Sequence, residues 1–383
     1  MAPTTSTSAP PTPPTSSLPT AFPETTCLRR GLCPVTSLRA QGPEALESHS
    51  LYYEQHGPPS VKGDEEAIKG LTKVVFIMGL NSSSFSWGPQ VRWFGKGGEG
   101  GKGECTALVF DNRGVGNSGY PRGPYTTSGM AEDVICLLDY LGWTGERELN
   151  VVGISLGGMI AQELAYRIPQ RIASLVLAVT TPGSHAWNNF PPLKGLTSLA
   201  KLMFTPDPEK KVPIVLDMLF PAAWLSEKAK SDPHAELNGN TEDNKLGKTN
   251  REVQAEGFLR RVSITKPQLF LGHISQMAAA MTHKVNAARL AHISANIPKI
   301  AIVTGDDDHL VRPLGSLRIW EGMKSGVSKD DSGLDLQRVE LLQWEGTGHG
   351  IHAQREVEFN ALVERCVREG RALLDAGFKS RDV

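Results

Sequence analysis

The chain of 383 residues is predicted to fold as an α/β protein, with a mostly parallel β-sheet covered by helices on both faces. Short apolar runs rich in β-branched residues recur along the chain, and such runs are typical of strands buried on both faces. Segments with apolar residues at helical spacing lie between several of these runs. Alternation of this kind favours parallel strands joined by helical crossovers.

The predicted strands are short and end at glycine or polar residues. We interpret the weakly alternating segment 49–57 as an early strand of a hairpin. The continuous apolar runs follow it at 73–78, 106–110, 150–154, 175–179, 300–303 and 339–344. The amphipathic helices are predicted at 130–143, 157–168 and 356–377.

Two segments fall outside this alternation and set the domain boundaries. Residues 1–26 are rich in Ser, Thr and Pro and are predicted to form a disordered tail. Residues 182–297 are helical in pieces, rich in Leu and Met, and broken by prolines. We expect an α/β core from 27–181 and 298–383, with 182–297 as a helical insertion.

Composition excludes several functional classes. The chain has a net charge of −1 and no basic stripe of the kind that binds nucleic acid. No apolar run reaches the length of a transmembrane segment. The five cysteines are scattered without a CxxC pair, which favours a reducing, cytoplasmic location over a disulfide framework or zinc site. The glycine-rich segment 95–104 lacks the spacing of a phosphate-binding loop, so we expect no cofactor there. The acidic run 306–308 has no second ligand cluster with metal-like spacing elsewhere in the chain, so we expect no metal site.

Ser155 is the strongest candidate for chemistry. It stands in the sequence GISLG between Gly153 and Gly157, after a predicted strand and before a predicted helix. A turn of this type holds a nucleophile at strained backbone angles and leaves almost no room for side chains at the flanking positions. The Ser155 oxygen would lie at the positive end of the helix, near the N–H of Leu156.

A serine nucleophile needs a histidine base and an acid that orients it, and in chains with this turn they follow in the order Ser, acid, His. His349 lies in a glycine-rich loop after the last predicted strand, and His352 is the alternative. The sequence TGDDDHL, residues 304–310, follows the strand at 300–303 and would place three aspartates at the carboxyl edge of the sheet. The turn after Val179 has no carboxylate.

The combination of four sequence blocks resembles the α/β-hydrolase superfamily over residues 50–375, and most of all its esterase-like branch that includes aclacinomycin methylesterase-like proteins. The blocks are FIMGLNSSSFSW (76–87), VFDNRGVGNSG (109–119), VVGISLGGMIAQELA (151–165), and GDDDHLVRP (305–313) with EGTGHG (345–350). The resemblance implies an eight-stranded, mostly parallel sheet with a helical lid inserted after the sixth strand.

The resemblance also implies roles for individual residues. Ser155 would be the nucleophile, His349 the base and Asp308 the acid, because Asp308 fits the family spacing of Gly-x-x-Asp followed by an apolar pair and Pro. Asp307 is the second candidate for the acid. The oxyanion would be bound by the backbone N–H groups of Leu80 and Leu156.

The chain departs from the family in one block. Many members have His-Gly after the first long strand, where this chain has Met78-Gly79, and Asn81 could add a side-chain contact there. In the block 109–119, we interpret Asp111, Arg113 and Ser118 as a buried network that holds a turn together.

The expected activity is hydrolysis of a small-molecule carboxylic ester, or of a thioester or lactone, because a serine nucleophile favours acyl transfer to water. Two other uses of the same fold stay open. One is an acyltransferase or cofactor-free haloperoxidase, and the other is a weakly catalytic ligand-binding protein. The sequence leaves the oligomeric state open.

Overall fold

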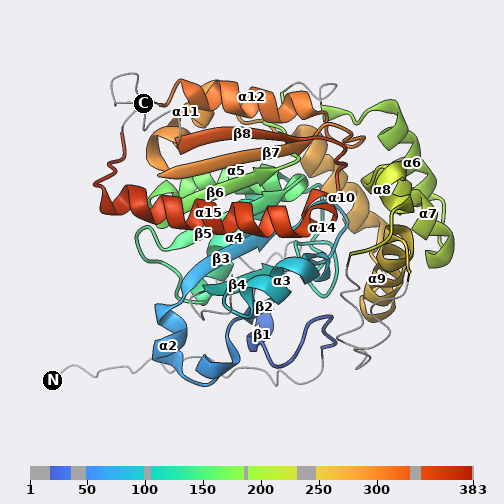
Figure 1. Cartoon of the computed structure of the whole chain (residues 1–383), viewed down its shortest axis with the longest axis horizontal. Helices are drawn as coiled ribbons and strands as arrows, with labels where there is room; N and C mark the ends of the chain where they lie inside the picture. Colours follow the sequence, from blue (N-terminus) through green and yellow to red (C-terminus); the bar gives the residue numbers. More distant parts are fainter. Residues whose placement is uncertain are drawn as a thin grey trace.

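One mixed β-sheet forms the centre of the molecule (Figure 1). The computed structural model describes residues 18–35, 49–98, 105–184, 189–230, 247–327 and 338–381. Eight strands lie in the order β1-β2-β4-β3-β5-β6-β7-β8. Their bounds are β1 (Cys27–Cys33), β2 (Leu51–His56), β3 (Thr72–Ile77), β4 (Cys105–Phe110), β5 (Leu149–Ile154), β6 (Ile172–Ala178), β7 (Lys299–Gly305) and β8 (Val339–Trp344).

The predicted fold class is confirmed. β1 and β2 form an antiparallel hairpin and β2 pairs antiparallel with β4, whereas all other neighbouring strands are parallel. Each predicted run lies in a strand or extends one residue beyond its C-terminal end, and the segment 49–57 contains β2. Strand β1 was not predicted because its sequence, CLRRGLC, has polar residues at its centre and only its two end residues are buried.

Two layers of helices cover the sheet. One face packs against α4 (Thr127–Tyr140), α5 (Leu156–Arg167), α11 (Ala287–Asn296) and α12 (Pro313–Lys324). The other face packs against α3 (Gly88–Phe94) and α15 (Glu356–Asp375), which lie in front of the sheet in Figure 1. Alternate residues of the strands supply the two cores, as expected for strands buried on both faces. The shorter elements are α2 (Glu65–Gly70), α14 (Ile351–Gln354), η2 (Pro59–Val61), η3 (Ser84–Trp87) and η5 (Pro169–Arg171).

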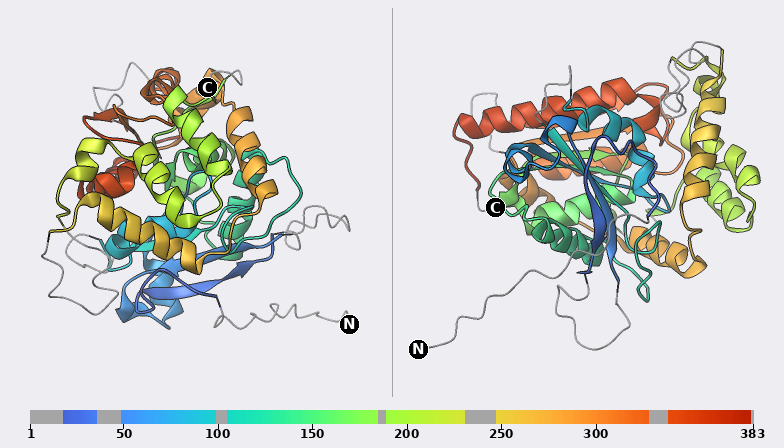
Figure 2. Two further views of the ribbon diagram at one scale, coloured as in Figure 1. Left: turned by 90° about the vertical axis from the view of Figure 1, so that its right-hand side faces the viewer. Right: turned by 90° about the horizontal axis from the view of Figure 1, so that it is seen from below.

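The predicted helical insertion follows the sixth strand and lies at one end of the sheet (Figure 2). It comprises α6 (Leu193–Met203), α7 (Pro208–Leu219), α8 (Ala222–Ser226), α9 (Asn250–Ile264) and α10 (Phe270–Thr282). Helix α11 lies within the predicted insertion, which was expected to end at residue 297, and it packs against α5 and α12 of the α/β core. Leu290 and Ile293 of α11 are buried in the same cluster as residues of α5 and α12.

The N-terminal boundary also differs from the prediction. Residues 1–17 lie outside the described part of the chain, but residues 18–26, which were expected in the tail, pack on the core. Phe22 is buried edge-on against His56 and Phe85, and the Thr20 hydroxyl donates a 2.8 Å hydrogen bond to the buried Glu54. The core therefore begins before Cys27.

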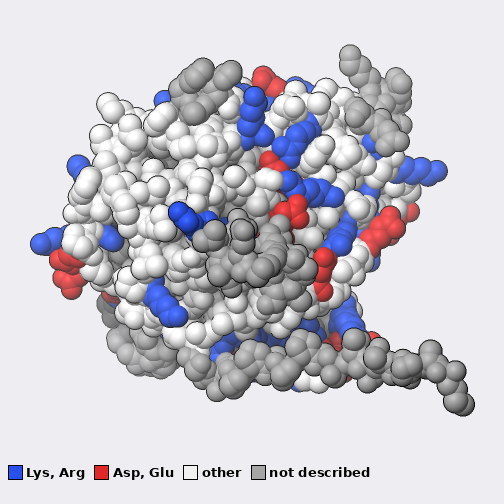
Figure 3. Space-filling model, turned by 180° about the vertical axis from the view of Figure 1, so that it is seen from behind, with Lys and Arg blue, Asp and Glu red and all other residues white. Residues whose placement is uncertain are grey.

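The described surface agrees with a chain of nearly balanced charge. On the face shown in Figure 3, basic and acidic side chains lie beside one another and do not form a patch of one sign. Below the surface, the carboxylate of the buried Glu163 binds both Arg167 and Arg289. Within the described ranges, no helix is long and apolar enough to cross a membrane.

His352 is half-buried beside the sheet. Its ring packs against Trp87 and Phe359, with ring centroids 5.0 and 6.4 Å away, and Nε2 lies 3.2 Å from the carbonyl oxygen of Ser86. Burial lowers the pKa of His352 from its usual 6.5 to about 3, and Arg261 and His349 act in the same direction. The ring is therefore neutral in the folded protein and donates to Ser86.

Replacing His352 with Gln should make the free energy of unfolding less sensitive to acid. Between pH of about 6.5 and about 3, the unfolded chain binds a proton at His352 that the folded chain does not, so stability falls as the pH falls. H352Q should therefore lose less stability than wild type between pH of about 6.5 and about 5. Urea unfolding followed by circular dichroism measures this. Parallel pH profiles for the two proteins would contradict the assignment.

Candidate active site

Ser155 forms a strained turn between β5 and α5. Its φ is 56° and its ψ is −123°, a combination that residues with a side chain rarely adopt. Three hydrogen bonds hold the turn. The Ser155 N–H donates to Ala178 O at 2.9 Å, and the Ser155 carbonyl accepts from Thr180 Oγ1 at 2.8 Å and from Met159 N at 3.1 Å. The backbone is thus fixed from β6 and from the first turn of α5.

The glycines on either side of Ser155 allow this close packing, as the sequence predicted. A Cβ atom at Gly157 would lie 2.0 Å from Ile77 O, and one at Gly153 would lie 2.5 Å from Gly157 O. Both distances are far below van der Waals contact. Side chains at these two positions would push α5 away from β3 and β5 and would displace the turn that carries Ser155.

The loop after β3 passes next to Ser155. A Cβ atom at Gly79 would lie 3.1 Å from Ser155 Cβ and 3.6 Å from Ser155 Oγ. The structure therefore brings the Leu80 loop and the start of α5, with Leu156 as its first residue, to the same side chain. Met78, which replaces the usual His, is buried among core residues and leaves the backbone of this loop in place.

Asp308 and His349 form a buried pair at the carboxyl edge of the sheet. His349 Nδ1 lies 2.8 Å from Asp308 Oδ2, so the ring donates this hydrogen to the carboxylate and leaves Nε2 as its free nitrogen. The other oxygen of Asp308, Oδ1, accepts from the N–H groups of Leu310 and Val311 at 2.8 and 2.9 Å. Both oxygens are used, so the carboxylate has one orientation.

The neighbouring aspartates have other partners. Asp306 is exposed and accepts from the N–H of Thr347, and Asp307, the second candidate for the acid, lies 3.0 Å from His309. The half-buried His352 contacts Ser86 and aromatic rings, and none of the aspartates in the described ranges is bonded to it. Across the described ranges, no group of three or more His, Cys, Asp or Glu side chains could hold a metal ion.

Gln354 shapes the loop that carries His349. Its Nε2 donates to Gly346 O at 2.7 Å, and its Oε1 accepts from Gly348 N at 2.8 Å. Gly346 has a φ of 59°, which favours glycine. A single buried amide therefore closes the turn that brings His349 back toward Asp308. Sequence reasoning did not identify Gln354, because its role depends on a fold-back that no local pattern indicates.

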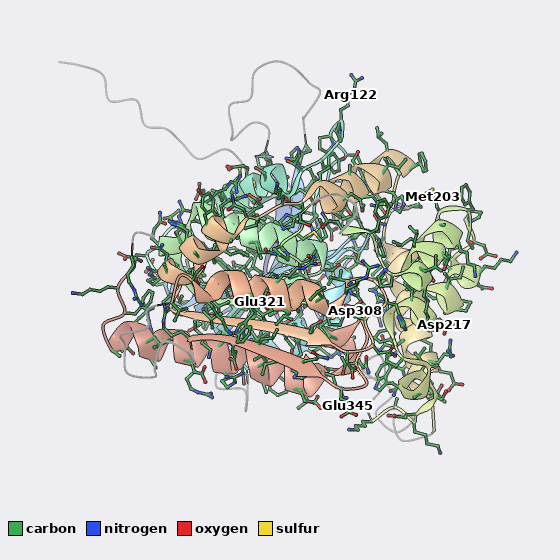
Figure 4. The ribbon with its side chains drawn as sticks, turned by 90° about the horizontal axis from the view of Figure 1, so that it is seen from above. Arg122, Met203, Asp217, Asp308, Glu321 and Glu345 are labelled. Carbon is green, nitrogen blue, oxygen red and sulfur yellow. The ribbon has the colours of Figure 1, made fainter. Side chains whose placement is uncertain are left out.

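The insertion lies directly over this edge of the sheet. The N–H of Gly350 donates to Leu219 O at 2.9 Å, and a Cβ atom at Gly350 would lie 2.3 Å from the ring of Phe220. Gly195 of α6 is packed against the carbonyl oxygen of His309. Figure 4 shows Asp308 at the end of the sheet that faces the insertion, which carries Met203 and Asp217.

The turn in the block 109–119 is held by buried polar groups, as predicted. Asp111 accepts from the N–H groups of Ser84 and Asn117 at 2.7 Å, although burial still raises the pKa of Asp111 to about 6. Ser118 Oγ donates to the carbonyl oxygen of Asp111. Arg113 makes two 2.6 Å hydrogen bonds to Asp133.

Two further side chains hold the loop next to Ser155. Asn112 Nδ2 donates to Met78 O at 2.9 Å, and Gln276 Oε1 accepts from the N–H of Asn81 at 2.9 Å. Asn81 was expected to make a side-chain contact, and its Nδ2 lies 2.6 Å from His273 Nδ1. Neither Asn112 nor Gln276 was singled out from the sequence, where nothing marks them.

Comparisons with known proteins identify the fold family. The family model described as alpha/beta hydrolase fold matches residues 74–353. A poly(3-hydroxyalkanoate) depolymerase of Ectopseudomonas oleovorans is 43% identical over 81 residues, which are 21% of this chain and 28% of that protein. The 3-oxoadipate enol-lactonase 2 of Acinetobacter baylyi is 30% identical over 138 residues, which are 34% of this chain and 48% of that protein. The chain thus spans less than half the length of these two relatives.

The solved structures show a shared fold. A thermophilic esterase from Thermogutta terrifontis superposes with a TM-score of 0.57 and 16% identity, over 89% of this chain and 99% of the esterase. The match to the family model covers most of the chain and includes the turn at Ser155 and the loop at His349. The chain belongs to the α/β-hydrolase fold family.

Proposed function

We propose that the protein is a serine hydrolase that cleaves a carboxylic ester, or a related thioester or lactone, of a small or lipophilic substrate. The observation that carries this proposal is the Asp308–His349 hydrogen bond at the same sheet edge as the strained turn of Ser155. A nucleophile on a sharp strand-to-helix turn, with a histidine whose Nδ1 is bound to an aspartate, is the arrangement that acyl transfer requires.

The proposed reaction has two stages. Ser155 Oγ attacks the carbonyl carbon while His349 Nε2 accepts the hydroxyl proton, and the N–H groups of Leu80 and Leu156 bind the resulting oxyanion. His349 then gives the proton to the leaving alcohol and the acyl-enzyme forms. Water attacks the acyl-enzyme, His349 accepts its proton and returns it to Ser155, and the carboxylic acid leaves. Asp308 keeps the tautomer of His349 that has Nε2 free.

The insertion would act as a lid that gives the site an apolar environment. It contacts the loops of Asp308 and His349 through Gly195 and Phe220. It also holds most of the large apolar side chains that the described surface exposes, and this supports a lipophilic substrate. These side chains are Phe190, Leu193, Leu196, Met203, Phe204, Val262, Leu269, Phe270, Leu271 and Ile274.

The names of similar proteins support the reaction type. An esterase and an enol-lactonase are both named for cleavage of a carbonyl–oxygen bond. Membership of the aclacinomycin methylesterase-like branch stays a prediction, and so does the cytoplasmic location that the cysteines indicate. All five cysteines are free in the structure.

Replacing Ser155 with Ala should abolish hydrolysis of p-nitrophenyl esters. Loss of the nucleophile removes the acyl-enzyme route, and the residual rate should be at least about a thousandfold below wild type. Release of p-nitrophenolate from acyl chains of different length measures the rate and ranks the substrates. Undiminished turnover in S155A would exclude the proposed mechanism. A wild type that binds esters without turnover would favour a ligand-binding protein, and acyl transfer to an added alcohol or thiol in preference to water would favour an acyltransferase.

Exchanging each aspartate of the run 306–308 for Asn, one at a time, tests the choice of acid. D308N should lower kcat at least about a hundredfold, because an amide facing Nδ1 favours the wrong tautomer of His349. D306N and D307N should keep kcat within about twofold, since neither carboxylate contacts His349. The folds of all three are compared by thermal unfolding. A larger loss of kcat in D307N than in D308N would assign the role to Asp307.

A further inference from the structure

Asn81 carries a strained backbone beside the proposed oxyanion donor. Its φ of 57° lies in the left-handed region, which costs free energy for a residue other than glycine. Such a conformation persists only where surrounding contacts hold it. The conformation of Asn81 matters for the reaction, because Asn81 follows Leu80 directly and its angles affect the direction of the Leu80 peptide.

Helix α10 of the insertion supplies the contacts that hold Asn81. Gln276 is fully buried, and its Oε1 accepts from the N–H of Asn81 at 2.9 Å while its Nε2 donates to Arg113 O at 2.8 Å. His273 lies one turn earlier on the same face of α10, and its Nδ1 accepts from the side-chain amide of Asn81 at 2.6 Å. Burial lowers the pKa of His273, so the neutral ring is available as an acceptor.

The other side of the loop is held from the core. Asn112 Nδ2 donates to Met78 O at 2.9 Å, and the neighbouring Arg113 accepts from Gln276. The amide of Asn112 therefore fixes the Met78–Gly79 peptide, and the amide of Gln276 fixes the Leu80–Asn81 peptide. The Leu80 N–H lies between these two anchors in the chain, directly after Gly79, whose Cβ position would be 3.6 Å from Ser155 Oγ.

We infer that Gln276 is a positioning residue for the oxyanion site, so that the insertion supplies part of the catalytic geometry in addition to covering it. This inference rests on the proposed function. The bond between Gln276 and Asn81 connects residues that are 195 positions apart, and it makes the direction of the Leu80 N–H depend on where α10 sits. A hydrogen-bond donor that is already aimed at the oxyanion lowers the barrier more than one that must reorient.

The packing of α10 supports a fixed position. A Cβ atom at Gly272 would lie 2.6 Å from Gly114 O and 2.7 Å from the ring of Tyr120. One at Gly123 would lie 1.9 Å from Ser275 Oγ. The α10 backbone is thus in close contact with the segment 114–123 of the core, and no space remains for the helix to move inward.

Steady-state hydrolysis of a p-nitrophenyl ester by Q276M and Q276E tests the inference. Methionine fills the same space without hydrogen bonds. Glutamate at this fully buried position is expected to be protonated, so one oxygen accepts from the N–H of Asn81 and the hydroxyl donates to Arg113 O. Loss of an oxyanion donor lowers kcat by about 10²–10³, so a misdirected donor in Q276M should lower kcat by about tenfold, with KM within about twofold of wild type. Q276E should recover most of the lost kcat.

Q55M is the matched control. Gln55 of β2 is also fully buried, and its Nε2 donates to Oγ1 of Thr106 in β4. This pair lies away from the site. Q55M should lose thermal stability without loss of kcat at temperatures well below its unfolding. Wild-type kcat in Q276M, or equal losses of kcat in Q276M and Q276E, would overturn the inference. A wild type that hydrolyses no ester would contradict the proposed function. An active wild type with an equally active Q276M would contradict only the role of Gln276.

Discussion

The positions of the loops in the proposed active site depend on the strained backbone of Ser155. A residue with a φ of 56° between a strand and a helix requires that the helix begin almost in contact with the neighbouring strand ends. Gly153 and Gly157 permit that contact, and the carbonyl oxygen of Ala178 holds the Ser155 N–H. Strand order then determines which loops reach the serine. Because β5 lies between β3 and β6, the loops after β3 and β6 lie on either side of it.

Hydrogen bonds between distant segments complete the site on this frame. Gln354 closes the loop of His349, the N–H groups of Leu310 and Val311 orient Asp308, and Gln276 holds Asn81. Each of these groups is a buried or half-buried polar atom with a partner of suitable geometry, so it restricts one side chain to one direction. The proposed reaction uses that restriction, because a nucleophile, a base and an oxyanion donor act together only when each is already aimed.

Local sequence patterns were sufficient to predict the repeated strand and helix elements of the fold. Buried apolar runs identified the strands that lie inside the sheet, and GxSxG with its flanking elements identified Ser155. Strand β1 was missed because it lies at the edge of the sheet and lacks an apolar run. Helix α11 was assigned to the insertion because the segment 182–297 shows no strand–helix alternation, although Leu290 and Ile293 belong to the main core.

The contacts that orient the site could not be predicted in this way. His349 and His352 are close neighbours in the sequence, and only the fold places one beside Asp308 and the other among aromatic rings. The roles of Asn112 and Gln276 depend on segments that meet only in the folded chain. A hydrogen bond between an amide in an inserted helix and a loop near the other end of the chain leaves no local signal.

The most direct test of this account is to locate the covalent adduct formed with a fluorophosphonate. The wild-type protein is incubated with the probe, digested, and its peptides are sequenced by mass spectrometry. We expect one adduct, on Ser155, which forms much more slowly when His349 is replaced by Ala. An adduct on another residue, or no adduct in a folded protein, would contradict Ser155 as the nucleophile.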